Sequence, residues 1–230
     1  MRQRFTVTLS MLLIICLLSA AQAAAADLQA GVQLSYGSTN FSKLLGTDTL
    51  KAAQLLSNVW ARYDHEDLRF TGLYQGSTGL GSKAMGRHLG QVAANYRFLK
   101  EGPMQIYGGI GYHFLSTSVH DQNRSFSLTG HGFAGQVVVD IELAPQFSAT
   151  AALTTSPWVK WSYSSGGQQD NDIATRSSFN AKIDFVYDFS EQLSVQVGLL
   201  GGTFRVPSFS DKGETQASFT AINAGITQRF

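Results

Sequence analysis

The 230-residue chain is poor in charge and rich in apolar residues, which excludes several classes of protein. Charged residues make up 14% of it, against roughly 25% in an average soluble domain, while 43% are hydrophobic and 11% aromatic. Disordered chains have few aromatic residues, and bundles of membrane helices need repeated apolar runs of about 20 residues. With a formal charge of +1, the chain also lacks the basic excess of a protein that binds nucleic acid.

The first 26 residues have the composition of a secretory signal peptide. Arg2 and Arg4 give a positively charged start, a short apolar segment follows, and the alanines after it fit a small-x-small cleavage site. We therefore expect a cleaved signal peptide at 1–26 and a single domain at 27–230.

After residue 26, apolar and polar residues alternate with period two, which predicts strands with one apolar and one polar face. In the first run, for example, Val32, Leu34 and Tyr36 alternate with polar residues. Pro157 interrupts the seventh run, where we expect a bulge or a local loss of pairing. The ten predicted strands are 27–37, 52–65, 67–77, 87–99, 103–117, 126–143, 146–164, 172–189, 192–204 and 215–230.

The predicted connections between these strands alternate in length. Tight turns are expected at 65–66, 100–102, 144–145 and 190–191, and longer polar loops at 38–51, 78–86, 118–125, 165–171 and 205–214. Short turns at one end and long loops at the other are typical of a β-barrel that spans an outer membrane.

Aromatic residues gather near both ends of the predicted strands. They are Phe98, Phe147, Tyr187, Phe189 and Phe230 towards the turns, and Tyr36, Tyr74, Phe114, Trp161 and Tyr163 towards the loops. Two aromatic girdles that flank an apolar band favour a bilayer over the alternative, a soluble β-sandwich or lipocalin-like barrel. We therefore expect the apolar face of each strand to contact lipid.

The signal peptide, the alternating strands and the ending 219–230 together resemble the small outer-membrane β-barrel proteins of Gram-negative-type bacteria. The terminal Phe230, preceded by alternating apolar residues, is similar to the signal read by the barrel-assembly machinery, although Gln228 departs from that pattern. The resemblance implies a transmembrane antiparallel up-and-down β-barrel of ten strands, with eight as the alternative. It also implies a monomer in the outer membrane, in contact with its lipids. A fold class does not determine function.

The polar clusters do not match known outer-membrane enzymes. Asp170 and Asp172 supply an acidic pair like that of omptin-like proteases, but His120-Asp121 has the wrong order and spacing for their Asp-x-His pair. His131 is not followed two positions later by the hydroxyl that the lipid A deacylase-like barrels carry. The histidines lack metal-ligand spacing, and a calcium site would need six or more oxygens. We expect no enzymatic activity, no metal and no cofactor.

With the apolar faces outside, charged side chains point into the lumen near the turn end. In a ring of ten strands the third lies opposite the eighth, so basic and acidic groups would face each other, with Asp64 and Lys182 as exceptions. Unpaired burial costs several kcal/mol per ion, so we predict a plug of paired charges; the alternative is solvated charges in a wet cavity. The predicted cluster comprises Arg62, Arg69, Arg97, Asp140, Glu142, Asp184 and Asp188.

A ten-stranded barrel is little wider than the eight-stranded kind, whose interior is filled by side chains, so a wide pore is not expected. The sequence favours a non-enzymatic outer-membrane barrel whose exposed loops have a structural or adhesive role. The alternative is a narrow or gated channel for small solutes, and an outer-membrane enzyme is the third possibility.

Overall fold

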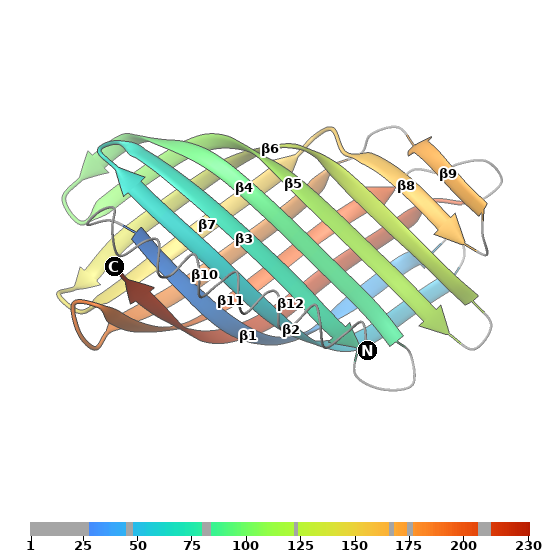
Figure 1. The fold of residues 1–230 in the computed structure, drawn as a ribbon, viewed down its shortest axis with the longest axis horizontal. Coiled ribbons are helices and arrows are strands. Elements are labelled where there is room, and N and C mark those ends of the chain that lie inside the picture. The colour runs from blue at the N-terminus through green and yellow to red at the C-terminus, as the bar shows by residue number, and fades with distance from the viewer. Residues whose placement is uncertain are drawn as a thin grey trace.

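The computed structural model describes residues 28–44, 48–79, 84–121, 124–165, 168–173, 177–206 and 213–230, almost all of them in antiparallel strands (Figure 1). The predicted signal peptide lies outside these residues. In the part of the chain described, no helix is long and apolar enough to cross a membrane. The strands are β1 (Leu28–Leu44), β2 (Asp48–His65), β3 (Leu68–Gly79), β4 (Ala84–Glu101), β5 (Met104–Asp121), β6 (Arg124–Ala144), β7 (Phe147–Ser156), β8 (Lys160–Ser165), β9 (Gln168–Ile173), β10 (Ser178–Asp188), β11 (Leu193–Val206) and β12 (Thr215–Arg229).

The strands close into one barrel of ten positions, as predicted. Pairing runs from β1 through β2, β3, β4, β5, β6, β7, β10 and β11 to β12, which pairs back with β1. β8 continues the line of β7 along β6, so the two together form the seventh barrel strand. β9 pairs with β8 and β10 pairs with β7, so β9 and β10 together form the eighth barrel strand. Closure leaves the wall between β1 and β12 without an edge strand.

The short turns and the C-terminus lie at the same end of the barrel, at the left of Figure 1. We call this the turn end and the opposite end the loop end. The backbone N–H of Phe230 donates to the carbonyl of Leu28 at 2.9 Å, which ties the last strand to the first at this end. Glu66 and Gly102 have positive φ angles of 54° and 51°, as tight hairpins require.

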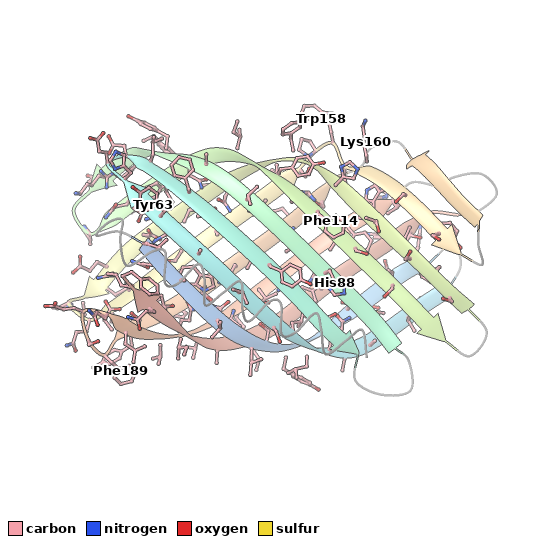
Figure 2. The ribbon with its side chains drawn as sticks, in the orientation of Figure 1. Tyr63, His88, Phe114, Trp158, Lys160 and Phe189 are labelled. Carbon is pink, nitrogen blue, oxygen red and sulfur yellow. The ribbon has the colours of Figure 1, made fainter. Side chains whose placement is uncertain are left out.

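The outer surface of the turn-end half is apolar. Ile110 and Phe133 are 76% and 74% exposed, and neighbouring outward positions are also aliphatic or aromatic. Figure 2 shows Tyr63 and Phe189 near the turn end, and Phe114 and Trp158 near the middle of the barrel. Contiguous exposed apolar surface of this extent is rare on soluble monomers. The apolar faces of this half therefore face lipid, as predicted.

Towards the loop end the two faces of the wall exchange chemistry. Outward positions there are polar, among them Asn40, Lys51 and Ser127, while most inward positions are apolar. β5 and β6 have 18 and 21 residues, against the 9–11 that a bilayer-spanning strand needs. About half of each strand therefore projects into water, where a barrel is stable with a polar outside and an apolar inside.

The exchange is visible in the sequence as a shift of the apolar residues by one position. In β6, Phe133 and Val137 point outward, whereas Phe126 and Leu128 point inward along the same unbroken strand. The prediction that the apolar face of each strand contacts lipid throughout is therefore wrong for the loop-end half. The predicted loops 38–51 and 118–125 are mostly strand for the same reason, since polar outward residues were interpreted as loop.

The seventh barrel strand reaches the same result by a different route. Its apolar residues keep one parity in the sequence, but the strand itself is interrupted, as predicted at Pro157. Pro157 and Trp158 are both exposed, while Ser156 and Val159 on either side are both buried. Because two successive residues point outward, the odd-numbered residues of β8 point inward, whereas those of β7 point outward.

This reversal corrects the predicted loop-end girdle. Trp161 and Tyr163, expected to face lipid, are buried inside the barrel, with Trp161 only 1% exposed. The Trp161 ring packs against Phe204 with centroids 5.2 Å apart. It also covers Gly130, where a Cβ atom would lie 2.7 Å from the ring, so this close approach requires glycine. Trp158 points outward in their place (Figure 2).

We expect Leu128→Ala to lower the free energy of unfolding by about 2–5 kcal/mol, because Leu128 is fully buried in the loop-end half. The matched control is Ser127→Ala, its outward neighbour on β6, which should change stability by less than about 0.5 kcal/mol. Urea unfolding of the refolded protein measures both. Equal effects of the two variants would contradict an apolar core at the loop end.

The terminal residue is predicted to control assembly. Deletion of Phe230, or Phe230→Asp, should reduce the amount of folded barrel in the outer membrane, since the last strand must pair with the first to close the wall. Heat-modifiable migration on gels measures the folded fraction. Unchanged outer-membrane levels would show that Phe230 carries no assembly signal.

Candidate functional site

The lumen of the turn-end half contains a cavity of about 230 Å³. Amide and hydroxyl side chains from many different strands form the largest group in its wall. They include Gln33, Asn58, Gln75, Gln91, Gln136, Thr150, Thr154, Asn180 and Gln196.

A cluster of fifteen buried apolar residues, the apolar core, fills the lumen beyond this cavity. Its members come from β1, β2, β4, β5, β6, β8, β11 and β12, and so from positions all around the ring. Leu89 belongs to the core and also lines the cavity, while Leu73 lines the cavity and packs against the core. The polar cavity therefore ends where the apolar core begins, and the core closes the lumen towards the loop end.

Two arginines and two aspartates form a compact charge cluster near the turn end. Arg69, 3% exposed, donates from Nε to Asp64 at 2.7 Å and from Nη1 to Asp140 at 2.6 Å. Arg62 Nε lies 3.3 Å from Asp64 Oδ2, and Arg62 Nη1 lies 3.8 Å from Asp140 Oδ2. The Arg69 guanidinium also covers the Tyr107 ring at 3.7 Å. The four charges compensate one another across the lumen.

The other residues predicted for this cluster lie apart from it. Arg97 pairs at 2.6 Å with Asp67, whose side chain is half exposed at the rim, and Glu142 is exposed. Asp184 pairs with Lys182 at 2.6 Å, and Asp188 accepts a hydrogen bond from Ser194. The structure thus brings together three of the seven predicted residues, Arg62, Arg69 and Asp140.

Asp64 and Lys182, the exceptions to the predicted segregation of charges, are ion-pair partners in the structure. Each opposes the sign of its neighbours on its own wall, and this is what allows local pairing. That signal was present in the sequence, because Asp64 pairs in register with Arg69 on the next strand. The role of the cluster as a plug remains a prediction.

One imidazole–hydroxyl pair lies deep in the barrel. His113 Nε2 and Ser178 Oγ are 3.0 Å apart and both residues are buried. Neither residue lines the cavity, and His113 Nδ1 has no hydrogen-bond partner to orient the ring, unlike the imidazole of a catalytic triad. Over the described ranges, no three His, Cys, Asp or Glu side chains are grouped so as to hold a metal ion.

Two clusters considered from the sequence cannot be assigned from the structure. The side chains of His120, Asp121, Asp170 and Asp172 lie outside those described.

Solved structures with the same architecture are outer-membrane proteins. The outer-membrane protease OmpT from Escherichia coli matches with a TM-score of 0.61 at 9% identity, covering 89% of this chain and 97% of that one. The translocator domain of the autotransporter NalP from Neisseria meningitidis matches with a TM-score of 0.54 at 10% identity, covering 98% and 97%. The chain is an outer-membrane β-barrel. This fold and the lipid-facing apolar band place it in the outer membrane.

These similarities carry the fold and no activity, since a protease and a translocator domain share it. Neisserial surface protein A also matches, at 13% identity over 88% of this chain and 97% of that one, with a TM-score of 0.45. No family model matches the chain, and no curated protein sequence matches it significantly.

We expect Arg69→Ser to destabilise the barrel by about 3–5 kcal/mol, because it removes the more buried of the two guanidinium groups that pair with Asp64 and Asp140 and leaves them only the longer contacts to Arg62. The matched control is Arg97→Ser, which removes an ion pair at the exposed rim and should cost about 0–1 kcal/mol. Guanidinium unfolding followed by tryptophan fluorescence measures both. If the two variants lose equal stability, the buried cluster is no more important than a surface ion pair.

Proposed function

We propose that this protein is a non-enzymatic, non-conducting outer-membrane barrel that acts through the end projecting from the membrane. The apolar core carries this proposal. An ion that crossed the lumen would have to leave water and pass among fifteen close-packed apolar side chains, and burial of an unpaired charge in such surroundings is strongly unfavourable. Because the core is made of strand side chains, a simple loop movement does not remove it.

The projecting end offers a surface suited to contacts outside the cell. Its walls carry hydroxyl, amide and lysine side chains, including Lys160, which points away from the barrel in Figure 2. β9 pairs with β8 and with no other strand in the part of the chain described. Its second edge therefore presents backbone N–H and C=O groups, to which an extended segment of a partner can add. This arrangement supports a structural or adhesive role.

The interior supports a non-enzymatic reading. The imidazole–hydroxyl pair His113–Ser178 lies away from the cavity, and the charge cluster around Arg69 is engaged in ion pairs. In this proposal the protein is a monomer that is inserted by the barrel-assembly machinery and contacts outer-membrane lipids through its apolar band.

A narrow channel for small solutes is the second candidate, and the polar cavity favours it. The cavity reaches from Arg229 and Asp188 near the turn end to Leu89 at the apolar core, and so covers part of the required path. Conduction would require the core to open, which distinguishes the two candidates by experiment.

We expect the purified protein to give no stepwise current in planar lipid bilayers. The triple variant Arg62→Ser, Arg69→Ser and Arg97→Ser should also fail to conduct, because the apolar core closes the lumen independently of these charges. It should instead lose thermal stability. Discrete conductance steps from the wild-type protein would support the channel. Steps from the triple variant alone would show that the charge cluster, and not the apolar core, is the barrier.

A further inference from the structure

Arg87 on β4 is a buried cation that has no ionic partner among the described residues. The residue is 3% exposed, and its Nε and Nη1 atoms have no hydrogen-bond partner. Its Nη2 atom lies 3.5 Å from Asn180 Oδ1, at the limit of a hydrogen bond. The guanidinium rests over the Phe219 ring, 4.0 Å from its centroid. No carboxylate of the described residues forms an ion pair with it.

Three other cations that line the cavity differ from Arg87, because each has an ionic partner. Arg62 and Arg69 share Asp64 and Asp140, and Lys182 pairs with Asp184. A guanidinium carries five N–H donors, and burying them unsatisfied is strongly unfavourable. Since these other cations are compensated by carboxylates, the lack of a described carboxylate beside Arg87 is a specific feature of this position.

Arg87 lines the cavity at its inner end, where the polar wall gives way to the apolar core. Leu73, Leu89, Leu200 and Phe219 line the cavity in this part of the barrel. The wall as a whole carries more basic than acidic side chains. The basic ones are Arg62, Arg69, Arg87, Lys182 and Arg229, and the acidic ones are Asp184 and Asp188.

We propose that the cavity binds a small carboxylate, with the carboxylate group on the Arg87 guanidinium and the short hydrocarbon part against Leu73, Leu89 and Leu200. The planar fork of N–H donors on arginine matches the two oxygens of a carboxylate. The cavity of about 230 Å³ is smaller than the roughly 300–1,000 Å³ of pockets for drug-sized ligands, so the ligand has only a few carbon atoms. The apolar core closes the loop end, so the ligand reaches Arg87 from the turn end.

The experiment measures binding of sodium butyrate to the refolded mature protein in detergent micelles by isothermal titration calorimetry. Butyramide, which has the same hydrocarbon part and no charge, and sodium chloride are titrated in parallel. We expect saturable binding of butyrate, and weaker binding of butyramide and chloride. Arg87→Gln should weaken butyrate binding about tenfold or more, as the loss of a charge-assisted contact predicts.

The matched control is Arg229→Gln. It removes a cation from the turn-end wall of the same cavity and should leave butyrate binding within about twofold of the wild type, since it does not contact the proposed site. Arg87→Lys keeps the charge but lacks the planar fork, so it should bind butyrate more weakly than the wild type. Heat-modifiable migration verifies that each variant folds, and Arg87→Lys provides the test if Arg87→Gln does not fold.

Equal binding of butyrate by the wild type and a folded Arg87 variant would overturn the proposal. Equal binding of butyrate and butyramide would also overturn it, because the cavity would then bind hydrocarbon without using the charge. Chloride binding as tight as that of butyrate, lost in Arg87→Gln, would replace the carboxylate by an inorganic anion. The inference goes beyond the proposed function, since a barrel can bind a small anion whether or not it conducts, and the bilayer currents are measured separately.

Discussion

The structure depends on one constraint: each strand passes from lipid to water along its own length. In a closed barrel, only one face of each strand contacts the surroundings. The outward residues must therefore be apolar within the bilayer and polar beyond it. The inward residues are then complementary, with amides such as Gln33 within the membrane and apolar groups such as Leu128 outside it. The lumen is polar where the outer surface of the wall faces lipid, and apolar where the outer surface faces water. Its closure follows from this exchange.

The two halves of the lumen are stabilised by different interactions. In the turn-end half, burial of polar groups is compensated by pairing, and the cluster around Arg69 satisfies two arginines with two aspartates. In the loop-end half, stability comes from apolar burial, worth about 1.5–3 kcal/mol for each large aliphatic or aromatic side chain removed from water. Among the described residues, only the second half resembles the interior of a soluble protein, with fifteen buried apolar side chains in one cluster.

Strand number, closure and the interruption at Pro157 could be predicted from the sequence, because period two and turn length depend on local residues. The reversal of the faces was missed, because periodicity shows that two faces differ and does not show which one lies inside. The shift between Phe126 and Phe133 was available as a signal, because both residues lie in the predicted strand 126–143 at opposite parity. Pairing across the lumen was harder to predict. Arg69 reaches Asp140 on the sixth barrel strand and not the eighth, because strand tilt and side-chain length decide which groups meet.

Arg87 marks the level at which the two chemistries of the lumen meet. An apolar residue there would extend the core, and an amide would extend the polar wall, so neither half requires a cation at this level. The guanidinium has one face on Phe219, Arg87 lines the cavity, and no described carboxylate forms an ion pair with it. A charge kept in such a place costs stability unless something neutralises it. A small anion that enters from the turn end meets that requirement at the point where the sealed lumen ends.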